Sequence, residues 1–123
     1  MIIPLRPGLM IPGKWVMYEY YCEQDNELLH IKEDQLLRKK LFWEIEFESD
    51  GIFRQRSNIP VKFFENEKDY RWSLSGNFIN ICSLVPDHKE VFQFALVKDQ
   101  MRLLQKTRSG SIVFFGFFKK QPF

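Results

Sequence analysis

The chain has little cysteine and little histidine. Its 123 residues include two of each. Cys22 and Cys82 lie far apart and lack the spacing of metal ligands, so two small thiols are favoured over a disulfide framework. His30 and His88 offer too little material for a histidine-based metal site. We therefore expect neither a bound metal nor a cofactor.

A long apolar run and a marked excess of one charge are also missing. No uninterrupted apolar stretch is long enough to span a bilayer, so we expect no transmembrane segment. The net charge of +2 is too small to imply nucleic acid as a partner. The start, MIIPLRPGLM, has no charged region followed by a continuous apolar one, so it does not predict a signal peptide. The compartment is left open.

Aromatic residues, in contrast, are abundant. The chain has 13 Phe, 4 Tyr and 3 Trp among 45% hydrophobic residues, which indicates one globular domain over 1–123 with a sizeable core. After residue 40, short alternating runs separated by turn residues predict an all-β antiparallel meander. Eight such strands can close into an up-and-down barrel, which removes their edges. We expect strands near 14–22, 41–48, 52–57, 70–75, 78–83, 90–98, 101–107 and 111–119.

The second predicted hairpin, LFWEIEFESDGIFRQRS, shows how the register follows from the pattern. A three-residue loop, Ser49 to Gly51, places Phe47 opposite Phe53 on the inner face. It also sets Glu46 against Arg54 outside, followed by a second Glu–Arg pair. A two-residue loop would set Phe47 against Arg54, so the longer loop is predicted.

The registers predicted for the remaining hairpins also place their apolar residues on the inner face. Turns are predicted at Gly76-Asn77, Asp99-Gln100 and Ser109-Gly110. Segment 25–40 fits neither period, and we expect a short helix or lid there; segment 58–69 is interpreted as a loop. The inner face then holds Trp43, Ile45, Phe47, Phe53, Gln55, Trp72, Leu74, Ile79, Ile81, Phe92, Phe94, Leu96, Leu103, Gln105, Ile112 and Phe114.

The triplet Gly13-Lys14-Trp15 opens the first predicted strand. Together with the strand order, the hairpin FESDGIF, the run WSLSGNFINI and an apolar last strand followed by basic residues, it resembles the lipocalin-like (calycin) superfamily. The likeness to small bacterial lipocalin-like proteins extends over most of the chain. The resemblance implies that Trp15 closes the barrel base and that Lys119 or Lys120 packs over it. It also implies an exported or cell-envelope protein. A half-buried strand aromatic is the alternative for Trp15.

The inner face has two interpretations. It can form a hydrophobic cavity for a small apolar or amphipathic, lipid-like ligand, bound without catalysis. Alternatively, the large side chains fill the barrel, which then acts as an envelope or protein-interaction module through its surface. We expect the first, with the following ligand-binding residues: Trp43, Ile45, Phe47, Phe53, Gln55, Trp72, Leu74, Phe92, Phe94, Leu103, Gln105 and Phe114.

The predicted inner face also holds polar residues. Gln55 and Gln105 are candidates to bond a ligand, but buried amides also bond each other, a tyrosine or water. Glu19 has the parity of an inward residue, and a β-bulge that turns it outward is favoured. His88 is interpreted as a solvated loop residue. Because no nucleophile and base stand in a catalytic pattern, no catalytic residue is predicted.

The final strand, SIVFFGFFKK, is apolar on both faces. With its neighbours it predicts an apolar patch outside the barrel, formed by Ala95, Val97, Leu104, Val113, Phe115 and Phe117. Two covers are available: segment 25–40, through its leucines and isoleucine, or a second copy of the chain. We favour the homodimer, with Leu104, Phe115 and Phe117 at the interface.

Overall fold

The computed structural model describes residues 7–84 and 87–122. Strands dominate this part of the chain, and every pairing between them is antiparallel. The elements in chain order are α1 (Pro7–Met10), β1 (Gly13–Gln24), β2 (Glu27–Ile31), α2 (Glu33–Lys39), β3 (Trp43–Phe47), β4 (Ile52–Ser57), β5 (Tyr70–Ser75), β6 (Phe78–Leu84), β7 (Asp87–Val97), β8 (Gln100–Lys106) and β9 (Ile112–Lys120).

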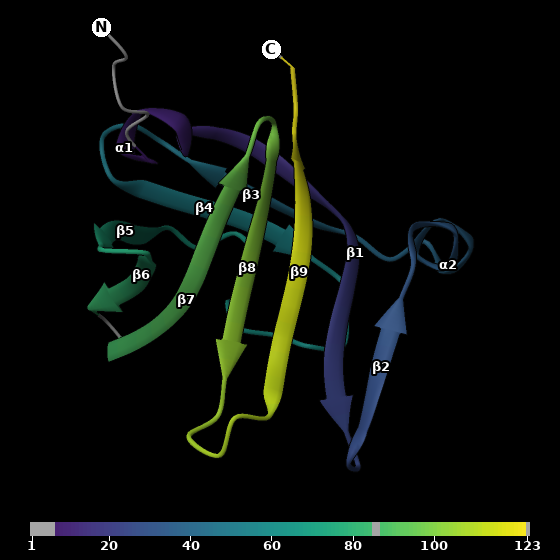
Figure 1. Cartoon of the computed structure of the whole chain (residues 1–123). Helices are drawn as coiled ribbons and strands as arrows, with labels where there is room; N and C mark the ends of the chain where they lie inside the picture. Colours follow the sequence, from purple (N-terminus) through teal and green to yellow (C-terminus); the bar gives the residue numbers. More distant parts are fainter. Residues whose placement is uncertain (1–6, 85–86, 123) are drawn as a thin grey trace, which may run out of the picture.

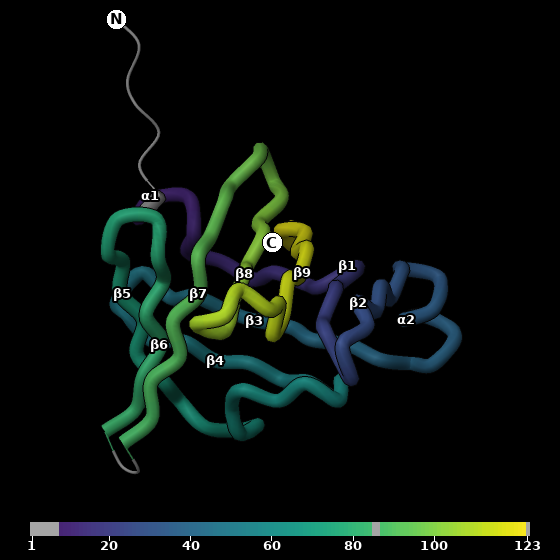
Figure 2. Tube along the Cα trace, turned by 60° about the horizontal axis from the view of Figure 1, so that its bottom comes forward, coloured from purple at the N-terminus to yellow at the C-terminus, as the bar shows by residue number. Residues whose placement is uncertain are grey.

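The sheet closes on itself. Strands β3 to β9 follow one another as neighbours, and β1 pairs with β3 on one side and with β9 on the other (Figure 1). Within the described residues this makes the expected eight-stranded antiparallel barrel, with β2 as one extra strand. Strand β2 pairs with the end of β1, and with α2 it extends to one side of the ring (Figure 2).

The predicted registers are confirmed in three hairpins and shifted in one. Phe47 lies opposite Phe53, Leu74 opposite Ile79, and Leu104 opposite Phe115. The predicted Asp99-Gln100 turn is wrong, because Val97 pairs with Gln100 and the turn is made by Lys98-Asp99. The shift equals two residues and leaves each side chain on its predicted face, because side chains alternate with a period of two.

Segment 25–40 contains the expected short helix and an unexpected strand. Asp25 and Asn26 both have positive φ and join β1 to β2 in a two-residue turn. An Asp-Asn pair between polar flanks is a hairpin signal that the sequence offers. Helix α2 buries Leu36 in the core but leaves Leu37 exposed. The alternative in which this segment covers the outer patch is not found in the described residues, since α2 lies beside β1 and not across β8 and β9 (Figure 1).

Candidate functional site

The centre of the barrel is packed with the chain's own side chains. Phe92 and Phe114 are 0% exposed, so no water-sized void lies against either ring. The Trp43 ring lies 5.2 Å from that of Phe114 and 5.5 Å from that of Phe118. The predicted ligand-binding residues do come together, but as a packed core. Trp72, Leu74, Phe94 and Gln105 are half-buried, and the remainder are buried: Trp43, Ile45, Phe47, Phe53, Gln55, Phe92, Leu103 and Phe114.

Residues 58–69, here named the mouth loop, complete this packing. The segment has no strand, as predicted, yet Phe63 reaches inside to Phe92 (5.0 Å between ring centroids) and Phe114 (5.7 Å). Phe64 packs on Tyr70 at 4.9 Å. The sequence interpretation missed this role. The signal was available, because a solvated loop rarely carries four large apolar residues within six positions.

The mouth loop lies where two neighbouring strands separate. Strands β4 and β5 are paired only at Ile52–Arg71 and Phe53–Tyr70 in the described residues. Beyond that point the side chain of Asn66 replaces a strand: its Oδ1 accepts the Ser57 N–H (3.0 Å) and its Nδ2 donates to the Ser57 carbonyl (3.1 Å). In Figure 2 this teal segment runs along the side of the ring opposite α1. We name this interruption the β4–β5 gap.

A hollow of about 480 Å³ opens to solvent beside the mouth loop. Its apolar wall is formed by Phe63, Phe64 and Tyr70, and its cationic edge by Lys62 and Lys68. The backbone N–H of Glu65 donates to the Tyr70 hydroxyl at 2.9 Å, which helps to hold the loop.

His88 also borders this hollow, at the start of β7. Its interpretation as a solvated loop residue is wrong. The ring is half-buried against Phe64 and Tyr70, and its Nε2 lies 2.7 Å from the Glu90 carboxylate.

Both predicted polar handles are bonded within the protein. Gln55 Oε1 accepts the Trp43 indole N–H at 2.8 Å, and its Nε2 donates to the Glu65 carbonyl and to Asn66. Gln105 Nε2 donates to Glu90 at 2.9 Å. Gln55 therefore fastens the mouth loop to the core, and Gln105 fastens β8 to β7.

The barrel base is built around Trp15. Its indole N–H donates to the Ile11 carbonyl at 2.8 Å, and the Lys120 Nζ lies 5.3 Å from the ring centroid. Gly13 has φ +133°, and a Cβ there would lie 2.9 Å from Lys120 Cε. Glycine thus gives both the backbone conformation and the path for the lysine. The assignment of Lys119 to this base is wrong, because Lys119 lies over Tyr18 outside the barrel.

The favoured bulge in the first strand is present. Pairing between β1 and β9 shifts between Met17 and Glu19, so Tyr20 points inward and stacks on Phe114. Glu19 points outward, where its carboxylate lies 2.5 Å from His30 Nε2. Burial raises the pKa of the Tyr20 hydroxyl above its usual value, as expected for a phenol whose charged form would lose water.

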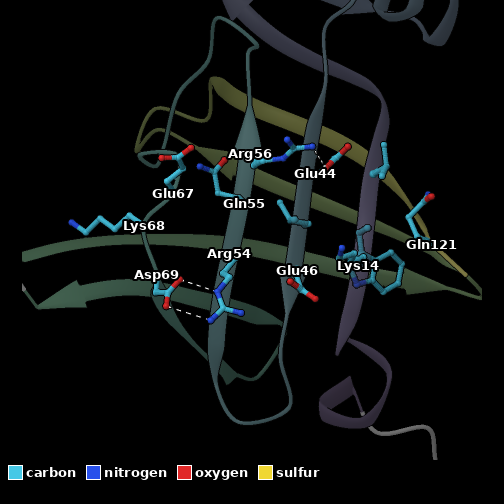
Figure 3. A pocket seen from close by; sticks show the side chains of 13 residues that line it. Lys14, Glu44, Glu46, Arg54, Gln55, Arg56, Glu67, Lys68, Asp69 and Gln121 are labelled. Carbon is cyan, nitrogen blue, oxygen red and sulfur yellow. Dashed lines mark hydrogen bonds and ion pairs between the residues drawn. The ribbon is translucent and has the colours of Figure 1, made fainter. Parts of the chain in front are cut away.

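The outer side of β1, β3 and β4 carries a shallow groove of about 600 Å³ (Figure 3). Its floor is a ladder of alternating charges, in which Arg56 pairs with Glu44 at 3.0 Å. Arg54 bonds Asp69 at 2.9 Å and also pairs with Glu48. Arg54 lies opposite Glu46, as the predicted register requires. Its ion-pair partners, however, are Asp69 and Glu48 and not Glu46. The hydrogen bond and charge of Asp69 raise the pKa of Arg54.

The described residues offer few reactive groups. Both cysteines are free, and burial raises the pKa of the Cys22 thiol, which disfavours the nucleophilic thiolate. Within 7–84 and 87–122, no cluster of three or more His, Cys, Asp or Glu side chains could hold a metal ion. No helix in the same ranges is long and apolar enough to cross a membrane.

Comparison with known proteins supports the fold. No protein-family model and no curated protein matches the chain. A crystal structure of an uncharacterized protein from Bacteroides eggerthii is similar, with 16% sequence identity and a TM-score of 0.51. The match covers 90% of this chain and 99% of the other. At this identity the likeness carries the fold alone.

Proposed function

We propose that the protein is a lipocalin-like binding protein that holds a small hydrophobic or amphipathic molecule, without catalysis, at the barrel mouth. Membership of the calycin superfamily is part of this proposal. It is supported by the barrel closed between β1 and β9 and by the base formed from Gly13, Trp15 and Lys120. The ligand site is placed under the mouth loop and not in a preformed cavity, because the core is filled.

One observation carries the proposal. Phe63 is a half-buried ring that fills the interior, yet it belongs to a loop without a strand and borders a solvent-open hollow. Its backbone has none of the ladder hydrogen bonds that hold core aromatics on strands, such as Trp43 and Phe92, in place. Loops of this kind open locally at low free-energy cost. An apolar ligand can therefore replace Phe63 beside Trp43 and Phe92 and enter through the β4–β5 gap.

The test compares wild-type protein with Phe63→Ala. Removing the ring should leave space next to Trp43, at a cost of about 1–3 kcal/mol in unfolding free energy, less than for a fully buried Phe. We expect a long-chain fatty acid to shift the Trp43 emission in wild type and to bind more tightly to Phe63→Ala. Native mass spectrometry of protein purified without delipidation should show the same ligand class.

Phe78→Ala is the matched control, because Phe78 points outward from β6 and is 43% exposed. It should leave fatty-acid binding unchanged. If fatty acids, retinoids, haem and sterols all fail to bind to wild type and to Phe63→Ala, and both give a clean apo mass, the binding proposal is wrong. A filled barrel that acts only through its surface would then be the better account.

A further inference from the structure

The outer side of the barrel carries an apolar surface that the proposed ligand site does not use. We define the outer aromatic face as Tyr18, Tyr21, Leu104, Val113, Phe115 and Phe117, all half-buried. Within it, the rings of Phe115 and Phe117 are 4.8 Å apart and each lies 6.0 Å from the Tyr21 ring. In Figure 1, β8 and β9 lie toward the viewer, and none of the described elements crosses them.

The charges on the β8–β9 hairpin, which forms most of this face, are all positive. From Gln100 onward the sequence has no aspartate or glutamate, although the whole chain has 16 acidic and 18 basic residues. Arg102, Lys106 and Lys119 are exposed on β8 and β9. The Arg102 guanidinium lies 5.5 Å from the Phe117 ring, and the Lys119 ammonium 4.5 Å from the Tyr18 ring.

The carboxylates nearest to the face lie on β1 and α2, outside this hairpin. Glu19 bonds His30, Glu23 accepts the Ile112 N–H at 2.9 Å, and Glu33 pairs with Lys119 at 3.4 Å. Lys119 is thus partly neutralised. The charges of Arg102 and Lys106 have no comparable anion on their own hairpin, β8–β9.

The shape of the face narrows the choice of partner. It is the outer wall of a barrel, and the two hollows described above lie elsewhere, at the mouth loop and over β1, β3 and β4. A peptide helix needs a groove. A second copy docked about a two-fold axis would bring the cations of β8–β9 on both copies together, which costs free energy.

We propose that the outer aromatic face binds the surface of an anionic lipid bilayer. Aromatic rings concentrate at the boundary between headgroups and acyl chains, and Phe115 and Phe117 present two of them side by side. Arg102, whose guanidinium lies over the Phe117 ring, and Lys106 carry long apolar stems, so their charged ends can reach lipid phosphates while the stems stay among apolar groups. The barrel would lie on the membrane with β8 and β9 against it and the mouth loop on another side.

The experiment measures sedimentation of the whole protein with vesicles of phosphatidylcholine alone or mixed with phosphatidylglycerol. Binding should require the anionic lipid and should weaken as salt is raised. Lys106→Gln should weaken binding about fivefold, since one cation near a membrane contributes about that factor. Lys39 of α2 is also exposed, and Lys39→Gln should leave binding unchanged. Phe115→Ser should weaken it too, with an unchanged circular dichroism spectrum.

Three results would overturn the proposal. The first is no binding to the mixed vesicles, and the second is equal binding to phosphatidylcholine alone. The third is an equal effect of Lys106→Gln and Lys39→Gln, which would mean that the net charge and not this face is responsible. Phe63→Ala should bind vesicles as wild type does, so failure of this proposal and failure of the fatty-acid site can be told apart.

Discussion

At the residue scale, Gly116 shows how tightly the interior is filled. It is an inward position of β9, between Phe114 and Phe118, and the Phe114 ring occupies the space where its side chain would lie. A Cβ built at Gly116 would be 2.3 Å from Phe114 Cζ. The missing side chain therefore lets Phe114 reach Trp43 and Tyr20 at the centre of the core.

Gly116→Ala should accordingly destabilise the protein. The added methyl group forces Phe114 out of its position, and overpacking of this kind costs about 1–3 kcal/mol. Thermal or urea denaturation would measure the loss. Gly8→Ala is the control, because nothing lies within 4 Å of a Cβ in that position of α1. Equal stability of the two variants would mean that Phe114 has another place to go.

The alternation of side chains along β9 was enough to choose between Lys119 and Lys120 as the residue that packs over Trp15. Phe114 was placed inward, so Lys120 has inward parity and Lys119 outward parity in the same strand. The close approach of Lys120 to Gly13 could not be predicted, because it depends on how the two ends of the barrel strands meet. Contacts between residues that are 105 to 110 positions apart carry no local signal.

At the element scale, the register of the β3–β4 hairpin was predictable. Its loop length, its inner Phe pair and its outer Glu–Arg pairs all agree with one register. The β7–β8 turn was less well determined, because a slip of two residues keeps every apolar side chain inside. For the mouth loop, the absence of a strand was predictable from the sequence. The burial of Phe63 was not, because it depends on the β4–β5 gap, which leaves no local pattern in the sequence.

The faces of the β3–β4 hairpin can be tested directly. Glu46 lies between Lys14 of β1 and Arg54 of β4, so Glu46→Lys sets three cations in a row on the surface. Because these charges are exposed to water, we expect a loss of only a few tenths to about 1 kcal/mol. Phe47→Glu should cost more than about 3 kcal/mol, since it buries a charge without a partner. Equal costs in denaturant unfolding would show that the faces are reversed.

At the scale of the whole molecule, whether the barrel is open or filled was beyond the sequence. The same inner residues line a cavity or pack together, depending on the ring's exact diameter and on what the mouth loop contributes. The count of thirteen Phe residues did not by itself predict a filled barrel, because several of them, such as Phe78, Phe115 and Phe117, lie outside the barrel. The oligomeric state was equally open, and the homodimer stays a prediction of the sequence analysis.

The charge distribution of the folded chain leads us to expect a monomer in solution. Light scattering coupled to size exclusion should give the monomer mass for wild type and for Phe115→Glu. The variant should stay folded, at a cost of about 1–3 kcal/mol, because Phe115 is half-buried against Tyr21 and Phe117 but lies outside the core. A wild-type dimer that dissociates on Phe115→Glu would instead support the homodimer and would contradict a free outer aromatic face.

The closure of the ring between β1 and β9 also determines when the protein can fold. The Lys120 ammonium bonds the Met10 carbonyl at 3.0 Å although 110 positions separate them in the chain. During synthesis, β1 therefore cannot pair with β9 until residues 112–120 have left the ribosome. Until then its edge and inward side chains stay open to wrong partners, and the conformational entropy of nearly the whole chain opposes closure. We expect the last step of folding to begin only after translation of β9, with the first strand as the segment most in need of a chaperone.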